Sequence, residues 1–242
     1  MPRKHITLAL AAILFLIGVA DAALNTIPEG GTAFIGEEGL DIRSTGAAAG
    51  SQLAWYGPGG APVTDVPRST ITVADATDFY LSSAVFSGKT GPWFLLPGKS
   101  LAFYVEDPKL NLRVRDETLD FEITGTTRWV PRGDVVGFRI ETNLDVMSQR
   151  QGTSGAPITI HAVSPDGAEY SSLSGFSLVD IPVDSSSYST GGVWATGDSV
   201  YTGGTYIMWA ECNANGLKDN YGVVGKTISF QVNVLVQLVN PM

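Results

Sequence analysis

The stretch LNLRVRDETLDFEITG, residues 110–125, decides the fold class because apolar and polar side chains alternate along it with a period of two. A polar break at Asp116-Glu117 divides the stretch into two halves. The apolar members of the two halves are Leu110, Leu112 and Val114, then Leu119, Phe121 and Ile123. The stretch therefore predicts two successive β-strands, each with one buried face.

Similar alternating runs recur along the rest of the chain. They lie at 32–42, 52–56, 69–75, 100–107, 134–143, 156–165, 176–183 and 204–212. Glycine and proline breakers such as Gly57-Pro58-Gly59-Gly60 separate them, and no long helical stripe follows residue 22. The pattern predicts an all-β protein with immunoglobulin-like β-sandwich architecture.

The segment TRWVPRG, residues 127–133, interrupts the pattern about midway. We therefore expect two sandwich domains, an N-terminal one at 23–126 and a C-terminal immunoglobulin-like one at 127–242. A single two-sheet domain with a long inserted loop would produce a similar pattern.

The N-terminus has the three parts of a secretory signal peptide: basic residues 2–5, an apolar run at 6–19 and the small-residue site Ala20-Asp21-Ala22. We expect cleavage after residue 22, a secreted protein and no membrane span afterwards. The alternative is an uncleaved anchor, but the apolar run is short for the roughly 20 residues that a bilayer requires.

Acidic residues outnumber basic ones by 24 to 15, which gives a net charge of −9. This balance argues against a nucleic-acid partner, because such binding needs a cationic surface. The single cysteine, Cys212, excludes an internal disulfide. We expect a buried thiol there, with a link between two chains as the alternative.

The C-terminal run 228–238 is predicted to form one long strand. Its even-numbered residues are all apolar: Ile228, Phe230, Val232, Val234, Val236 and Leu238. One interpretation is a terminal core strand. The other is that these residues reach a neighbouring subunit, since long apolar strand edges pair with other chains unless they are blocked.

The loop ECNANGLKDNYG, residues 211–222, is the densest polar cluster in the chain. Asn213, Asn215 and Asp219 are candidate calcium ligands, although the residue at the last EF-hand position is Gly222 instead of glutamate. The alternative is a structural turn, because Asn215-Gly216 tolerates positive φ. The turn is the favoured interpretation.

The sequence favours a protein that is not an enzyme. GTSGAP, residues 152–157, resembles a serine-protease nucleophile segment, but His161 follows Ser154 too closely along one extended segment to act as its base. The pairs Glu37-Glu38 and Asp116-Glu117 are neighbours that point to opposite faces of a strand. A single histidine after residue 22 also disfavours a zinc or copper site.

Two aromatic features invite different interpretations. Trp55-Tyr56, beside a glycine-rich turn, is a candidate carbohydrate contact. Trp209 alternates with Ile207 and is predicted to lie in the core.

Several segments together resemble an uncharacterised extracellular β-domain family of methanogenic archaea, found in S-layer-like and sheath-like surface proteins. The matching segments are GGTAFIGEEGLDI (30–42), STITVADATDFYLSSAVFSGKTGPWF (69–94), VEDPKLNLRVRD (105–116), VPRGDVVGFRIETN (130–143) and GGTYIMWAECNANGLKDNY (203–221). The resemblance implies a secreted cell-envelope protein and supplies no catalytic residues.

We therefore expect a structural protein that self-assembles into a sheath, surface layer or filament through strand edges, with other envelope proteins as further partners. Many relatives resemble longer proteins with a membrane anchor, whereas this chain stops after the long strand, which favours retention by other subunits. The alternative is a monomeric extracellular module that binds carbohydrate or another envelope protein.

Overall fold

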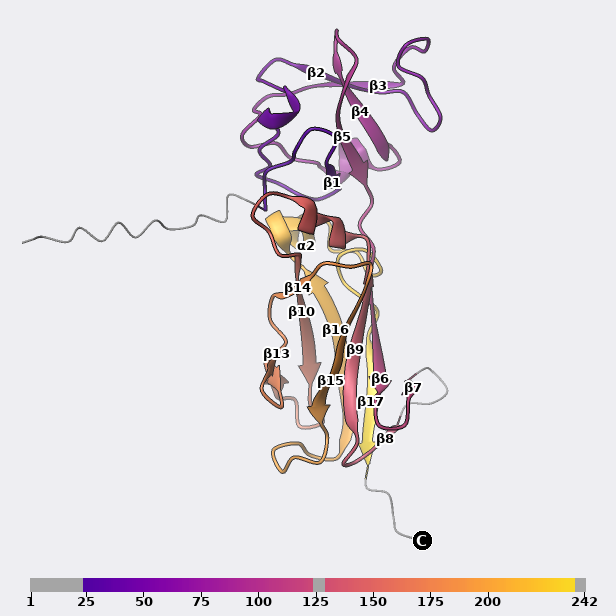
Figure 1. Ribbon diagram of the computed structural model, residues 1–242, viewed down its shortest axis with the longest axis vertical. Helices are drawn as coiled ribbons and strands as arrows, with labels where there is room; N and C mark the ends of the chain where they lie inside the picture. The colour runs from indigo at the N-terminus through magenta and orange to yellow at the C-terminus, as the bar shows by residue number, and fades with distance from the viewer. Residues whose placement is uncertain (1–23, 124–128, 238–242) are drawn as a thin grey trace, which may run out of the picture.

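The computed structural model describes residues 24–123 and 129–237, so the expected signal peptide lies outside the described residues. β-Strands dominate throughout, which confirms the all-β prediction. The strands form two domains stacked end to end in an elongated molecule (Figure 1).

The N-terminal domain is built on one five-stranded sheet with the order β1-β5-β4-β2-β3. β1 runs parallel to β5, and the other neighbours are antiparallel. The aromatic side chains of Phe86, Trp93 and Phe103 fill its core. Its elements are β1 (Thr32–Phe34), the 3-10 turn η2 (Arg43–Thr45), β2 (Gln52–Trp55), β3 (Ser69–Thr72), α1 (Ser83–Phe86), β4 (Gly91–Leu96) and β5 (Ser100–Glu106).

The C-terminal domain is a two-sheet sandwich. One sheet has the order β15-β9-β6-β7, and the other has the order β11-β10-β16-β17-β8, with β14 also paired to β10. Their strands are β6 (Leu110–Asp116), β7 (Phe121–Glu122), β8 (Trp129–Pro131), β9 (Val135–Thr142), β10 (Ala156–Val163), β11 (Glu169–Tyr170), β14 (Ile181–Val183), β15 (Ser187–Ala195), β16 (Gly204–Cys212) and β17 (Val232–Gln237). The remaining elements are the hairpin of β12 (Ser172–Leu173) and β13 (Phe176–Ser177), the 3-10 turns η3 (Leu144–Gln149) and η4 (Ala214–Gly216), and α2 (Leu217–Asn220).

A tyrosine corner supports the immunoglobulin-like assignment of this sandwich. The buried Tyr206, near the start of β16, donates its hydroxyl hydrogen to the carbonyl oxygen of Thr202 at 2.9 Å. The same contact between a tyrosine and the backbone a few residues upstream is a hallmark of immunoglobulin-like domains. The ring also packs against Trp194, with the ring centroids 4.8 Å apart. Burial raises the pKa of Tyr206, which favours the neutral donor.

The strand pairing places the boundary between the two domains earlier in the chain than the sequence predicted. β6 and β7 precede the boundary predicted near Thr126, yet β6 pairs with β9 along its whole length. The chain passes from the N-terminal sheet to the C-terminal sandwich at residues 107–109, between β5 and β6. The buried and outward positions of β6 alternate as predicted, but alternation does not specify which strand will be the neighbour.

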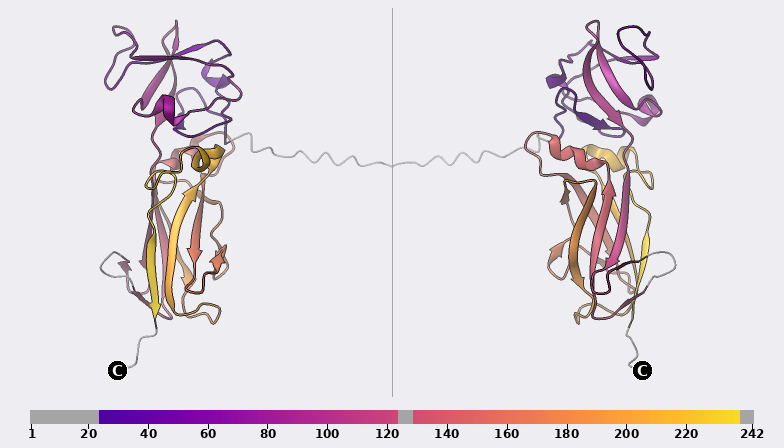
Figure 2. Two further views of the ribbon diagram at one scale, coloured as in Figure 1. Left: turned by 180° about the vertical axis from the view of Figure 1, so that it is seen from behind. Right: turned by 45° about the vertical axis from the view of Figure 1, so that its right-hand side comes forward.

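A buried ion pair joins the two domains. Arg150, just after η3, donates from Nη1 and Nη2 to the carboxylate oxygens of Glu37 at 2.7 and 2.8 Å. The side chains are 2% and 0% exposed, respectively. Arg150 also donates to the main-chain oxygens of Leu24 and Thr32, and Asn215 donates to Glu37. η3 and α2 lie at this junction in both views of Figure 2.

The last strand is shorter and more enclosed than predicted. β17 lies between β16 and β8, and its Val234 and Val236 are buried in the core of their own chain. Ile228 makes only isolated bridges, and the side chain of Phe230 is 64% exposed. Leu238 lies outside the described residues. The prediction of one continuous strand from 228 is therefore wrong, because the alternation of buried and exposed residues breaks before β17 begins.

Candidate binding face

The outer surface of the β10–β16–β17–β8 sheet carries a stacked pair of rings, charged side chains and exposed apolar side chains. Along β16, alternate side chains enter the core, so those between them point outward. We call this surface the β16 face. Its members are Trp129, His161, Glu169, Ile207, Trp209, Glu211, Lys218 and Leu235.

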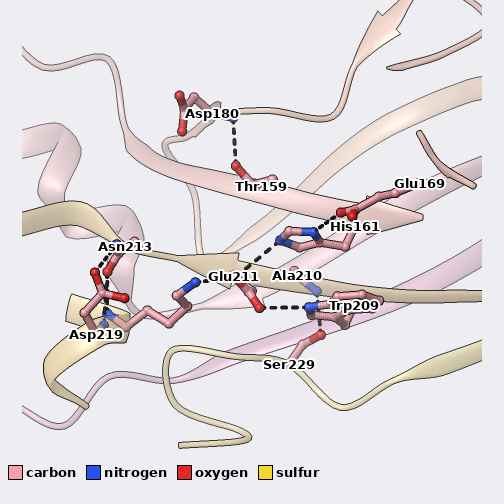
Figure 3. A network of polar contacts seen from close by, with 11 residues as sticks. Thr159, His161, Glu169, Asp180, Trp209, Ala210, Glu211, Asn213, Asp219 and Ser229 are labelled. Carbon is pink, nitrogen blue, oxygen red and sulfur yellow. Dashed lines mark hydrogen bonds and ion pairs between the residues drawn. The ribbon is translucent and has the colours of Figure 1, made fainter. Parts of the chain in front are cut away.

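The centre of the β16 face is a stacked pair of rings (Figure 3). His161 on β10 lies directly opposite Trp209 on β16, with ring centroids 4.7 Å apart and planes only 7° from parallel. Trp209 is thus on the outer face, and the prediction that it lies in the core is wrong. Tyr206 and Met208 face inward instead. Both faces of this strand are apolar, so alternation did not identify the buried one.

Two carboxylates flank the imidazole of His161. Nδ1 lies 2.5 Å from Glu169 Oε1, and Nε2 lies 3.3 Å from Glu211 Oε2. The ring can donate to both carboxylates at once only when both nitrogens carry protons. Glu211 also accepts hydrogen bonds from Trp209 Nε1 at 2.9 Å and Lys218 Nζ at 3.0 Å.

The environment of Glu211 favours its charged form. Burial raises the pKa of this carboxyl, but hydrogen bonds from Trp209 and Lys218, together with the charges of His161 and Lys218, outweigh burial and lower the pKa overall. Glu211 is therefore an anion held in a fixed position, which suits binding by hydrogen bonds better than proton transfer near neutral pH.

A hollow of about 280 Å³ opens beside His161 and Glu211. Its other polar lining residues include Thr159, Asp180, Asn213 and Lys218. Within residues 24–123 and 129–237, no three His, Cys, Asp or Glu side chains form a metal-binding group. The hollow therefore offers hydrogen-bond donors and acceptors to a polar ligand.

The other half of the β16 face is mainly apolar, with the exposed polar residues Thr205 and Asn233 among its apolar side chains. Ile207 is 37% exposed and Trp129 is 40% exposed. The half-buried Leu235 pairs directly with Trp129 across the β17–β8 ladder. Large apolar side chains exposed beside polar groups make this surface a candidate for contact with another molecule.

The three candidate calcium ligands do not converge on one point. Asn213 Oδ1 accepts hydrogen bonds from the backbone N–H groups of Lys218 and Asp219, and its Nδ2 donates to Asp219 Oδ2. Asn215 adopts positive φ and turns toward Glu37 at the domain junction. The loop therefore has the structural role that the sequence favoured, capping α2 and completing the junction.

The candidate carbohydrate contacts are buried. Trp55 is 8% exposed and Tyr56 is 3% exposed, so the prediction of an exposed aromatic pair is wrong. Trp55 donates from Nε1 to the carbonyl oxygen of Thr90, and the Tyr56 ring packs edge-on against Phe94. The neighbouring glycine-rich turn indicated a loop correctly but did not indicate the exposure of the residues before it.

The other reactive side chains lie apart from one another. Ser154 precedes β10 and is separated from His161 by seven residues of mostly extended chain, about 20 Å. Both ring nitrogens of His161 are in any case taken by carboxylates. Cys212 is a buried free thiol, and burial raises its pKa to about 12, so it is protonated at neutral pH.

Comparison with known families gives one match. The model for the family described as a domain of unknown function (DUF3821) matches residues 29–219, a span that includes the N-terminal sheet, the domain junction and the centre of the β16 face. No curated protein matches the sequence. Among the described residues, no helix has the length and apolar character needed to cross a bilayer. The chain belongs to the DUF3821 family.

Proposed function

We propose that this chain is an exported structural protein of the cell envelope and that its copies associate into an ordered layer or filament. The observation that carries the proposal is the junction between the two β domains. Domains joined by ordinary interfaces move relative to each other. Here a buried bidentate ion pair with additional backbone acceptors holds them as one elongated unit, and a repeating assembly needs a unit of fixed shape.

The copies would contact one another through the apolar half of the β16 face, which replaces the strand-edge contact expected at 228–238. β17 already pairs with β16 and, near its end, with β8. Subunits with an excess of acidic residues repel one another, so association requires an attractive contact. Ile207, Leu235 and Trp129 supply apolar area for that contact.

The test is the assembly state of the purified secreted chain at rising concentration, followed by light scattering and negative-stain electron microscopy. We expect ordered layers or filaments for the wild type. Ile207→Lys and Trp129→Lys should keep the fold and prevent assembly. Val63→Lys is the matched control, since Val63 is 87% exposed in the N-terminal domain, outside the β16 face. A monodisperse wild type at every concentration would reject the proposal.

The hollow beside His161 favours a second candidate function, a monomeric module that binds carbohydrate or another envelope protein. A pocket with a few fixed polar groups beside an aromatic ring is suited to an oligosaccharide. Titration with oligosaccharides released from the envelope should then change the fluorescence of Trp209 in a chain that stays monomeric. Trp209→Leu, compared with Trp129→Leu, would identify the tryptophan that reports binding.

A further inference from the structure

Two carboxyl groups occupy inward-facing positions at the end of the sandwich far from the domain junction. Along β6 the buried residues are Leu110, Leu112, Val114 and then Asp116. Asp116 lies opposite the buried Val136 of β9, and Asp134 precedes Val136 by two residues on the same side of the strand. The series of inward-facing apolar side chains on these strands therefore ends with two aspartates.

The hydrogen bonds of these aspartates are incomplete. Asp116 is 0% exposed. Its Oδ1 accepts from the backbone N–H groups of Thr118 and Leu119 at 3.0 and 2.9 Å. Among the described residues, no donor reaches the buried Oδ2 of Asp116 or the buried Oδ2 of Asp134. A buried carboxylate oxygen without a partner is costly, so each one requires an explanation.

The pairing of Asp116 with Val136 places Asp134 at the diagonal position from Asp116 across the two strands. The nearby cations in the described part of the chain are engaged elsewhere. Arg115 pairs with Glu117 and Asp120, and Arg132 donates to the main-chain oxygen of Tyr201. Within residues 24–123 and 129–237, no Lys, Arg or His side chain therefore forms an ion pair with Asp116 or Asp134.

We infer that Asp116 and Asp134 together bind one hard divalent cation, Ca²⁺ or Mg²⁺. Both ions prefer oxygen ligands, and sites with one or two carboxylates are completed by water and backbone oxygens. Asp134 is half-buried whereas Asp116 is fully buried, so the pair lies at the edge of the core. The ion ties the turn after β6 to the start of β9. This inference is independent of the proposed function and of the loop at 211–222.

The experiment uses the whole secreted chain after treatment with chelator. Calorimetric titration with CaCl₂ and, separately, with MgCl₂ measures stoichiometry and affinity. Thermal unfolding at a series of free-ion concentrations measures stabilisation. We expect one ion per chain and a melting temperature about 5 to 10 °C higher at a hundred times the dissociation constant. The ion with the lower dissociation constant in these two titrations is the one that the site prefers.

Variants locate the site. Asp134→Asn should abolish both the binding heat and the ion-dependent rise in melting temperature. In chelator it should unfold no earlier than the wild type, because an amide can donate to Asp116 where a carboxylate repels it. Asp120→Asn, a substitution at an 84% exposed side chain near Asp116, is the matched control and should bind normally.

Two results would overturn the inference. One is the absence of saturable binding of either ion to the wild type, which would mean that the carboxyl groups share a proton instead. The other is loss of ion binding in Asp219→Asn with normal binding in Asp134→Asn, which would place the cation in the loop at 211–222.

Discussion

Glu37 and Asp116 are both 0% exposed, but their partners have opposite charges. Glu37 sits at the domain junction, where Arg150 matches both carboxylate oxygens and Asn215 donates a further hydrogen bond. Asp116 sits at the far end of β6, and the neighbouring Asp134 before β9 adds a second carboxyl group. The carboxylate of Glu37 is fully paired within the protein, whereas Asp116 and Asp134 each have one buried carboxylate oxygen without a donor among the described residues.

The difference shows that burial alone does not indicate what a carboxylate does. A buried charge costs several kcal/mol unless it is paired and hydrogen-bonded. At the junction, the positive charge of Arg150 compensates the buried carboxylate of Glu37, and this pair fixes the arrangement of the two domains. At the far end of the sandwich, the unpartnered oxygens of Asp116 and Asp134 are the groups that we infer bind a cation from solvent.

The largest effect is expected from breaking the junction pair. Glu37→Gln leaves the Arg150 charge buried without a counter-charge, and breaking a buried pair on one side costs about 3 to 5 kcal/mol. Denaturant unfolding should show this loss. Glu38→Gln, at the exposed neighbouring residue, should unfold like the wild type. If the two variants unfold at the same denaturant concentration, the pair does not hold the domains together.

A smaller, pH-dependent effect is expected at the carboxyl pair. In chelator the raised pKa of Asp134 means that the folded chain binds a proton more tightly than the unfolded chain. The stabilisation from that proton is fully present below the unfolded pKa, about 4, and is lost as the pH rises through the folded pKa. The melting temperature measured against pH should therefore fall in this window.

Asp134→Asn is the control for that pH profile. It removes the titrating carboxyl group, so the fall in melting temperature that this group causes should disappear. Added cation should reduce the fall in melting temperature with rising pH in the wild type, since metal binding favours the deprotonated carboxylates. An identical pH profile for the wild type and Asp134→Asn in chelator would contradict the coupling between the two aspartates.

The smallest effect is expected on the outer surface of the β6–β9 sheet. Arg113 contacts Glu122 at 2.6 Å and Glu141 at 2.8 Å, but its side chain is 40% exposed. Exposed ion pairs contribute about 0 to 1 kcal/mol and are screened by salt. Arg113→Ala should therefore change the denaturation midpoint only slightly, and less so in high salt. If Arg113→Ala loses as much stability as Glu37→Gln, then the exposure of an ion pair does not determine how much it contributes to stability.

Local pattern predicted much of the fold. The alternation in residues 110–116 predicted the buried and outward positions of β6, and the same argument gave the all-β class. The second half of the stretch was predicted less well, because Leu119 lies in a turn and is 54% exposed, and β7 contains only Phe121 and Glu122. The turn formed by the loop at 211–222 was also predictable, because Asn-Gly tolerates positive φ. These features depend on neighbouring residues, so a single sequence contains them.

The candidate site was not predictable in the same way. Outward positions of β16 include Ile207 and Trp209, and inward positions include Tyr206 and Met208, so both faces looked like a core. The only signal at His161 was an isolated histidine in a strand. Its contacts with Glu169 and Glu211 depend on a hairpin and on cross-strand register, which alternation does not fix.

The sequence by itself determined the strand periodicity, the turns and the acidic charge, because each follows from residue type and short-range spacing. The tertiary structure decided where the domains divide, which face of β16 is exposed and how each buried charge is compensated. Glu37 and Arg150 are 113 residues apart, and their pairing exists only because two separate domains dock. Asp116 and Asp134 meet only because β6 and β9 share a register, so long-range packing determined both buried charge sites.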